Sequence, residues 1–403
     1  MSDFLKMRKT ELFVSGNQKI VLKGVNLGGW LMMEGYIMHA PNRAEQLFKK
    51  EFQKHLGATA LLEFEHAFRE NFIQEKDIAF VANYGFNCIR VPFNYRLIEK
   101  RPFKFDTQGV LYLDRLVSWA QKYKVWIILD LHAAPGAQNY DWHSDSLGKA
   151  ELWTNQTNQK RTYAVWEFLA DRYKENRWIA GYNVLNESVT EDTRMLNKFY
   201  KELIKKIRAI DKNHILFIEG NNWSTDLNCL DVFEDDNTAL SIHVYRPSDF
   251  TFNFVPHLSY PLFYQNENWN KDSQKKFLEQ YAQIAQKRGC HIFVGEFGVN
   301  YREGFYGEDK WVDDMAGCFE ELGFSWAYWT YKAVKNGIFP DGIFSSSDNP
   351  PWVNRQGPKT GWETYHLHWP TKKQEMIHSW DTNRFSKNEK ILSVLSHYAK
   401  KLL

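Results

Sequence analysis

Residues 181–188 read Gly-Tyr-Asn-Val-Leu-Asn-Glu-Ser, a short apolar run that stops at an amide and a carboxylate. Val184 and Leu185 can be covered on both faces, which is typical of a strand in a parallel sheet. Asn186 and Glu187 then lie where the strand meets its loop. Taken alone, a carboxylate in such a place is more often a satisfied structural acid than a working group. The meaning of this pair therefore depends on the rest of the chain.

Seven other short apolar runs look like strands, and helical patterns separate most of them. The predicted strands, besides that in the quoted stretch, are 21–26, 87–91, 125–131, 215–219, 240–245, 291–297 and 325–331. The predicted helices are 42–84, 110–123, 161–176, 192–211, 272–288, 309–322 and 387–402. Strands that alternate with helices pair in parallel, and eight of them favour closure into an α/β fold of the (β/α)8 TIM barrel type. An open doubly wound sheet is the alternative, but Gly28 and Gly29 lack the spacing of its phosphate loop.

The chain of 403 residues shows no linker rich in Pro, Gly or Ser, so we expect a single domain over 1–403. An N-terminal β-hairpin is predicted over 11–23, with its turn at Ser15, Gly16 and Asn17. A long irregular loop is predicted over 332–386 after the eighth strand, followed by a closing helix over 387–402. Long βα loops are usually functional, and here they are 132–160, 246–270 and 332–386.

Composition excludes several classes of protein. The 51 basic and 49 acidic residues are interspersed, so we expect no nucleic-acid partner. No apolar run is long enough to span a bilayer, and residues 1–10 lack the apolar core of a secretory signal, which favours a cytoplasmic protein with no membrane partner. The four cysteines are scattered, so neither a disulfide framework nor a zinc site is expected. Aromatic residues make up 16% of the chain, a surplus that suits a cleft for sugar rings.

Polar side chains stand near the ends of most predicted strands. Active sites of (β/α)8 barrels lie at the C-terminal ends of their strands, so we expect these side chains to converge. Burying so many polar groups in one place is costly, which indicates a polar ligand. The residues are Asn26, Arg90, His132, Asn186, Glu187, Glu219, His243, Tyr245, Glu296 and Trp329.

Two of these carboxylates, Glu187 and Glu296, come from different strands and suggest a general acid/base paired with a nucleophile. Glycosidic bonds are cleaved with retention by two carboxyl groups about 5–5.5 Å apart. Arg90 beside Glu296 would stabilise a carboxylate there, and Tyr245 could donate to it, whereas a general acid needs a raised pKa. Asn186 could bind a sugar 2-hydroxyl. Spacing alone does not say which glutamate has which role.

Two alternatives belong to other classes. A non-catalytic sugar-binding protein could use the same scaffold, but a binder has no need for two carboxylates close together. A metal-dependent hydrolase would need a His-x-His pair after the first strand, where Asn26 stands instead. We therefore expect neither a metal nor another cofactor.

The motifs around these residues resemble glycoside hydrolase family 5, of clan A. The similarity lies in Asn186-Glu187, in Gly295-Glu296-Phe297-Gly298, and in the motifs CIRVP with Arg90, LDLH with His132, HVY with His243 and Tyr245, and AYWT with Trp329. The resemblance implies that Glu187 is the general acid/base and Glu296 the nucleophile. It also implies that Trp329 is a platform under the sugar next to the cleaved bond.

Within that family, the stretches 24–31 (GVNLGGWL) and 131–139 (LHAAPGAQN) look most like the exo-β-1,3-glucanase branch. The resemblance implies that Glu34 and Asn139 meet the terminal sugar. One departure is Ser188, where the family usually has proline. We expect a retaining β-glycosidase, exo-acting on gluco- or manno-configured glycosides or oligosaccharides. The alternatives within the family are a β-mannosidase and an endo-β-glucanase or mannanase. Nothing in the sequence predicts the oligomeric state.

Overall fold

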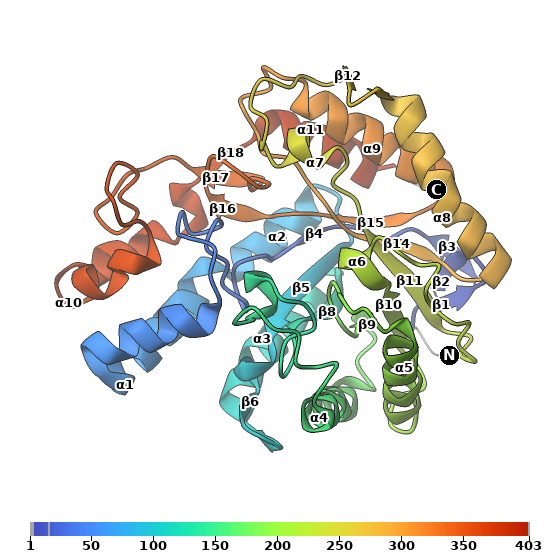
Figure 1. Ribbon diagram of the computed structural model, residues 1–403, viewed down its shortest axis with the longest axis horizontal. Helices are drawn as coiled ribbons and strands as arrows, with labels where there is room; N and C mark the ends of the chain where they lie inside the picture. The colour runs from blue at the N-terminus through green and yellow to red at the C-terminus, as the bar shows by residue number, and fades with distance from the viewer. Residues whose placement is uncertain (1–3, 15–16, 402–403) are drawn as a thin grey trace.

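Eight parallel strands close into a barrel in the computed structural model, which describes residues 4–14 and 17–401 (Figure 1). They follow one another around the barrel in chain order, and the last pairs with the first. The (β/α)8 prediction is therefore confirmed. The strands are β4 Lys23–Asn26, β5 Cys88–Asn94, β8 Trp126–Ala133, β9 Ile179–Asn183, β10 Ile215–Glu219, β11 Thr238–His243, β14 Ile292–Phe297 and β15 Ser325–Tyr328.

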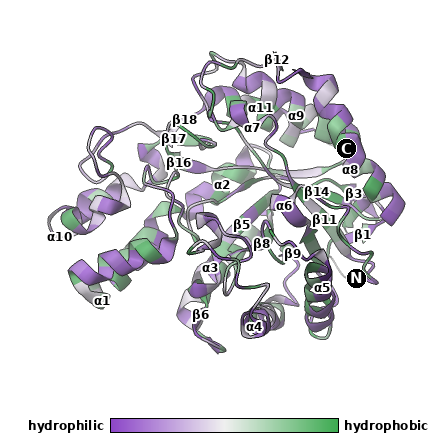
Figure 2. Ribbon diagram, in the orientation of Figure 1, coloured by the Kyte–Doolittle hydropathy of each residue, from purple (hydrophilic) through white to green (hydrophobic). Residues whose placement is uncertain are grey.

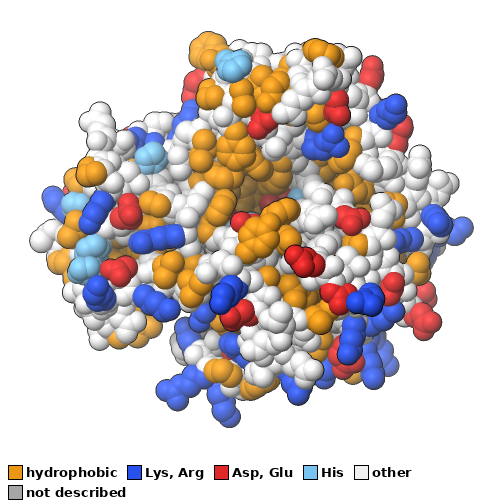
Figure 3. Space-filling view, viewed as in Figure 1, with side chains coloured by type: hydrophobic (Ala, Val, Ile, Leu, Met, Phe, Trp, Pro, Cys, Tyr) orange, Lys and Arg blue, Asp and Glu red, His pale blue; other side chains and the backbone are white. Residues whose placement is uncertain are grey.

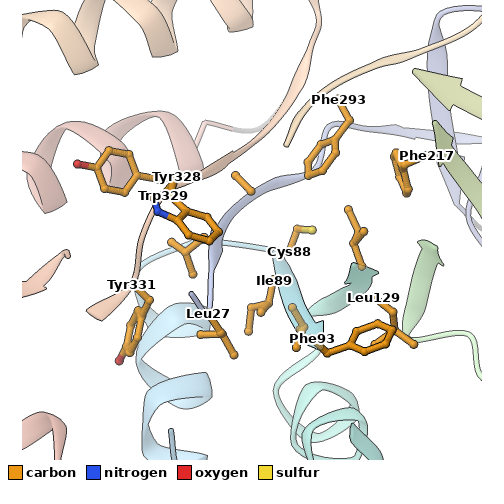
Figure 4. Close-up of a cluster of buried hydrophobic side chains, with 14 of the residues drawn as sticks. Leu27, Cys88, Ile89, Phe93, Leu129, Phe217, Phe293, Tyr328, Trp329 and Tyr331 are labelled. Atoms are coloured by element: carbon orange, nitrogen blue, oxygen red, sulfur yellow. The ribbon is translucent and has the colours of Figure 1, made fainter. Parts of the chain in front are cut away.

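Aromatic and aliphatic side chains from the barrel strands and the adjoining loops form a buried cluster (Figure 4). Phe217 of β10 and Phe293 of β14 lie with ring centroids 5.1 Å apart, although β11 separates their strands in the sheet. Such a contact is possible only across the interior. The eight strands thus enclose a packed core, and the site must be built on top of it.

Helices surround the barrel, and Figure 2 shows hydrophobic and hydrophilic residues mixed along their ribbons. The longer ones before the last strand are α1 Glu45–Phe72, α2 Glu75–Asn83, α3 Thr107–Tyr123, α4 Gln156–Tyr173, α5 Thr193–Arg208, α8 Lys271–Arg288 and α9 Glu308–Leu322. The single helix predicted over 42–84 is wrong. The chain leaves helical geometry at Ile73, and Gln74 begins α2 with a capping box to Asp77.

The predicted N-terminal hairpin is present as β2 Glu11–Val14 and β3 Gln18–Ile20, which pair antiparallel. A further strand, β1 Lys6–Arg8, joins β2 and makes a three-stranded sheet. Ser15 and Gly16 of the predicted turn lie outside the described residues. The closing helix is α11 Glu389–Ala399, and position 402 of the predicted helix likewise lies outside them.

The irregular loop predicted over 332–386 is wrong, because the segment has secondary structure of its own. Phe48 of α1 stacks on Trp362 at 5.3 Å between centroids, and Phe64 meets Trp369 edge-on at 5.3 Å. These aromatic contacts explain the 18-residue helix α10, which lies beside α1 in Figure 1. The segment contains β16 Lys332–Val334, β17 Phe344–Ser346, α10 Trp362–Ser379, the 3-10 turn η3 Thr382–Arg384 and β18 Ser386–Lys387.

The other βα loops contain short elements as well. They are the 3-10 turns η1 Tyr95–Leu97 and η2 Trp142–Ser144, the strands β6 Glu99–Arg101, β7 Lys104–Phe105, β12 Leu262–Tyr264 and β13 Glu267–Trp269, and the helices α6 Asn221–Ser224 and α7 Ser248–Thr251. Among the described residues, no helix is both long and apolar enough to cross a membrane.

Candidate active site

The polar side chains predicted to converge do so on the C-terminal side of the barrel. Glu219 and His243 are the last residues of β10 and β11, and Trp329 follows β15 directly. Arg90 differs from the prediction, because β5 continues pairing with β8 past Pro92 to Asn94. Its guanidinium therefore rises from within the barrel and not from a strand end.

Arg90 is fully buried and connects the whole site. Its Nη1 donates to Glu296 Oε1 at 2.7 Å and to Asn26 Oδ1 at 3.0 Å. Its Nη2 donates to Asn186 Oδ1 at 2.7 Å, and its Nε donates to Asn183 Oδ1 at 2.8 Å. Burial alone would lower the pKa of Arg90, but nearby carboxylates outweigh it and raise the pKa. Arg90 is a permanent cation that orients both Asn186 and Glu296.

Glu296 is held from two sides. Arg90 binds Oε1, and the Tyr245 hydroxyl donates to Oε2 at 2.8 Å. Burial and the charge of Glu296 raise the pKa of Tyr245 well above its ordinary value, so the phenol keeps its proton and remains a donor. The side chain of Glu296 is 6% exposed. This carboxylate is fixed in orientation while an edge of it stays accessible.

Glu187 has a strained backbone that other side chains hold in place. Its φ of +45° lies in the left-handed region, which is unusual for a residue with a Cβ. Its N–H donates to Glu219 Oε2 at 2.7 Å, and its carbonyl accepts from Asn139 Nδ2 at 2.8 Å. Burial raises the pKa of Glu219, but His243 and Arg90 outweigh it and lower that pKa to about 2, so Glu219 accepts as a carboxylate.

The Glu187 carboxyl lies between two histidines. His243 Nδ1 is 2.6 Å from Oε1, and His143 Nε2 is 3.0 Å from Oε2. Burial raises the pKa of Glu187, but charged His243 and His143 outweigh it and hold the pKa below its usual range. The pKa of His243 lies well above its ordinary value, because Glu219, Glu296 and Glu187 outweigh the effect of burial. The raised pKa expected of a general acid at Glu187 is therefore not present while both histidines are charged.

Asn139 has contacts that the family resemblance did not imply. It is fully buried, and its Nδ2 faces the Glu187 carbonyl and His143 Nε2 at 2.8 and 3.0 Å. Its Oδ1 accepts the N–H of Asp141 at 2.9 Å. The amide thus supports the loop and the backbone of Glu187. Contact with a terminal sugar stays a prediction for this residue.

Six aromatic side chains form a closed series of contacts near the carboxylates, which we call the aromatic belt. The Trp329 indole donates to the Tyr36 hydroxyl, and the neighbouring ring centroids in the rest of the series lie 5.1 to 6.1 Å apart. The members, in order of contact, are Trp329, Tyr36, Phe339, Trp142, His143 and His132, which stacks back on Trp329. The face of the molecule in Figure 3 is hollowed near its centre, with hydrophobic side chains around the hollow.

Glu34 lies against the belt. Its carboxylate is 3.6 Å from His132 Nε2, and His132 Nδ1 is 2.8 Å from Asp130 Oδ2. Burial lowers the pKa of His132, but these two acids outweigh it and raise the pKa to about 10. Glu34 Oε1 and Asn186 Nδ2 are buried and have no hydrogen-bond partner. A buried polar atom without a partner is costly, so both atoms suit a hydroxyl-bearing ligand.

Glu187, His243 and Glu296 also satisfy a simple geometric test for a metal site, with one ligand atom of each within 4.8 Å of the others. Their chemistry does not fit a cation. Arg90 already places its charge 2.7 Å from Glu296, and His243 Nδ1 already lies 2.6 Å from Glu187 Oε1, so the three groups are paired within the protein. The short distance between the Glu187 and Glu296 carboxylates suits two carboxyl groups that act on the same glycosidic bond.

Sequence reasoning missed some members of the site. Asp130 precedes His132 by two residues, so strand alternation could have placed both on one face. Tyr36, Trp142, His143 and Phe339 stand in loops, where no periodicity predicts direction. Ser188 is fully buried, with its hydroxyl 3.5 Å from that of Tyr200, and nothing in these contacts explains the departure from proline.

A closed barrel with paired carboxylates on its C-terminal side defines a glycoside hydrolase by class. The chain belongs to glycosyl hydrolase family 5, whose cellulase profile matches residues 50–335, and this family cleaves with retention. A Beta-xylosidase of Phanerodontia chrysosporium is 32% identical and covers 86% of this chain and 74% of its own. Endoglucanase C of Acetivibrio thermocellus is 30% identical, and the match covers 78% of this chain and 92% of that enzyme. A Glucan 1,3-beta-glucosidase of Schwanniomyces occidentalis is 25% identical, and the match covers 85% of this chain and 90% of that enzyme.

Proposed function

We propose that this hydrolase is an exo-acting β-glycosidase for gluco- or manno-configured terminal sugars. Glu296 attacks the anomeric carbon, and Glu187 protonates the departing oxygen and then activates the water that releases the sugar. One carboxylate oxygen of Glu187 lies within 4.8 Å of one of Glu296. This short separation supports a retaining mechanism, because inverting enzymes need about 6.5–9.5 Å between the two carboxyl groups to accommodate a water. The firm hold of Arg90 and Tyr245 on Glu296 favours it as the nucleophile.

The aromatic belt is the observation that carries exo action. A groove for a long chain must stay open at both ends, whereas the belt joins the loops after the neighbouring strands β15, β4 and β8 into one continuous aromatic wall, which suits a cleft that is blocked on that side. Glu34, with its unpartnered oxygen, lies against His132 of this series and suits the hydroxyls of a terminal sugar. The name of the glucosidase relative agrees with exo action, and the name of the endoglucanase relative keeps endo action as the competing outcome.

A panel of nitrophenyl β-glycosides and defined oligosaccharides, with products followed by proton NMR, tests the proposal. We expect a β-configured monosaccharide as the first product from each oligosaccharide. Internal cleavage that releases disaccharides or longer fragments first would overturn exo action. The panel also separates glucosides from mannosides, which differ only at the 2-hydroxyl, and it identifies the linkage.

Two substitutions test the structural argument. Trp142→Ala and Phe339→Ala each interrupt the belt without touching either carboxylate. We expect the ratio of internal to terminal cleavage to rise in both variants. Leu147→Ala is a matched control, because this side chain is 58% exposed in the same loop as Trp142.

A cytoplasmic location stays a prediction.

A further inference from the structure

The residues around His143 address how Glu187 obtains the proton that the proposed function requires. Glu187 Oε2 and His143 Nε2 lie 3.0 Å apart, a distance at which a proton on either atom forms a hydrogen bond to the other. If His143 holds it, Glu187 is a carboxylate and cannot act as an acid. If Glu187 holds it, the imidazole nitrogen must accept a hydrogen bond. The neighbouring amide of Asn139 decides between these two arrangements.

The orientation of the Asn139 amide follows from two backbone contacts. Its Oδ1 lies 2.9 Å from the N–H of Asp141, and its Nδ2 lies 2.8 Å from the carbonyl of Glu187. Exchanging the amide oxygen and nitrogen would set donor against donor at Asp141 and acceptor against acceptor at Glu187. The second N–H of the amide therefore points at His143 Nε2, 3.0 Å away.

An N–H that points at Nε2 is a hydrogen bond only if Nε2 carries no proton. The contact from Glu187 Oε2 to the same nitrogen is then favourable only if Oε2 carries a proton, so that the acid and the amide share the one lone pair of Nε2. On the other side of the carboxyl, protonated His243 donates from Nδ1 to Oε1 at 2.6 Å. A neutral carboxylic acid, with one accepting and one donating oxygen, satisfies both histidines.

We infer that Asn139 fixes His143 as a neutral acceptor, and that His143 thereby holds the catalytic proton on Glu187 Oε2. His143 is a positioning residue that acts through Glu187. When substrate binds, the glycosidic oxygen replaces Nε2 as acceptor of this proton. As Glu296 forms its bond to the anomeric carbon, the bond to the leaving oxygen breaks, and its electron pair takes the proton from Oε2.

The other groups that face His143 act on its charge in both directions. Burial lowers its pKa, and charged His132, whose ring centroid is 6.1 Å away, lowers it further. Glu187 and Glu34 oppose these effects and give a net rise. A proton placed on Glu187 removes the larger of those two opposing charges. Trp142, on the other side of His143 in the belt, has no charge.

The direction of a pH shift distinguishes the two arrangements, and it rests on the proposed role of Glu187. We expect His143→Leu to move the alkaline limb of kcat/KM about one unit to lower pH, because the acid form loses its acceptor. His143→Gln, whose amide oxygen can accept in the same place, should stay near the wild-type limb. A limb that moves to higher pH in His143→Leu would mean that a cation was removed, and an unmoved limb would mean no influence on the proton. Either outcome overturns the inference.

Leaving groups give a readout that a merely structural role would not move. At a pH above the limb, His143→Leu should lose about tenfold on an alkyl glycoside, which needs the acid. It should lose less than about twofold on a dinitrophenyl glycoside, which does not need it. An equal loss on both substrates contradicts the inference. Failure of the proposed function looks different, since Glu187→Ala would then keep its activity on alkyl glycosides.

The tautomer itself can be observed in the unaltered enzyme. Side-chain ¹⁵N NMR, with the His143 signal assigned by its absence in His143→Gln, should show a proton on Nδ1 and none on Nε2 at neutral pH. A charged ring, or a proton on Nε2, would overturn the inference without any question of folding.

Discussion

At the N-terminal end of the barrel, buried polar side chains each find their own local partners, whereas at the C-terminal end they share partners. Lys23, at the start of β4, donates to Glu320 at 2.7 Å and to the carbonyl of Tyr398 at 3.0 Å. His291, just before β14, is neutral and contacts the Thr10 carbonyl and Ser325 Oγ, each at 2.8 Å. These contacts tie the barrel to the chain termini.

The C-terminal end has the opposite arrangement. His243 faces three carboxylates, Arg90 binds both Asn186 and Glu296, and Asn186 Nδ2 and Glu34 Oε1 have no hydrogen-bond partner. Such a cluster does not minimise the free energy of the empty protein, because each unpartnered group costs about 1–3 kcal/mol. Both ends of the barrel therefore bury charged side chains. The active site differs in that several of its charged side chains contact one another. Substitutions at the two ends should therefore separate stability from activity.

The largest expected effect is that of Glu296→Ala. Removing the nucleophile should lower kcat/KM on an aryl β-glycoside by about 10⁵-fold. The melting temperature should stay close to that of the wild type, since Asp130 and Glu219 still pair with the charge of Arg90. Azide should restore turnover and give the product of inverted configuration. Substantial turnover without an added nucleophile would show that another residue attacks the sugar.

Tyr245→Phe should have the next largest effect, about 10²- to 10³-fold on kcat, because it removes the donor that orients Glu296 for attack and stabilises the charge that returns to it when water releases the sugar. Tyr182→Phe is the matched control. Its hydroxyl donates to Asp211 at 2.7 Å, away from the site, so this variant should lose about 1 kcal/mol of stability and no activity. Enzyme assays and urea unfolding of both variants give the comparison. Equal activity losses would contradict the separation of the two regions.

The sequence predicted the barrel and the strand-end residues because both follow from strict local patterns. Apolar runs of strand length identify β10 and β14 almost to the residue, and the side chains that follow them must point to one end. The same reasoning failed over 332–386, where α10 forms through long-range contact with α1. Propensity along the chain does not register a partner helix some three hundred residues away.

The roles within the site depend on contacts that a strand pattern cannot supply. His143 and Asn139 are four residues apart, yet their relation to Glu187 exists only because the loop after β8 contacts the segment after β9. Protonation is set by such contacts, so the chemistry of Glu187 could not follow from its position alone. The sequence therefore indicates which groups meet, and the structure shows the contacts that act on their protons.

Lys23→Ala tests the N-terminal end. It removes a cation whose side chain is 3% exposed, and it leaves Glu320 and two carbonyls without their donor. We expect a loss of about 3 kcal/mol in the free energy of unfolding, with kcat/KM within about twofold of wild type. Lys271→Ala is the matched control, because its pair with Glu321 is largely exposed and should be worth less than about 1 kcal/mol. Urea unfolding distinguishes them, and equal losses would contradict the argument.

His291 gives the smallest effect and a pH dependence of known sign. Burial lowers its pKa to about 4, so below the unfolded pKa of about 6.5 the unfolded chain binds more protons than the native one. Stability should therefore fall as pH falls, by about 2 kcal/mol between pH 7 and pH 5 from this residue alone. In His291→Gln the difference in unfolding free energy between these pH values should shrink by that amount, as measured by urea unfolding. The pKa of His243 is shifted upward instead, because carboxylates surround it. A His291→Gln variant whose stability keeps the wild-type pH dependence would show that His291 is not held neutral, and that the histidines at the two ends do not differ in charge.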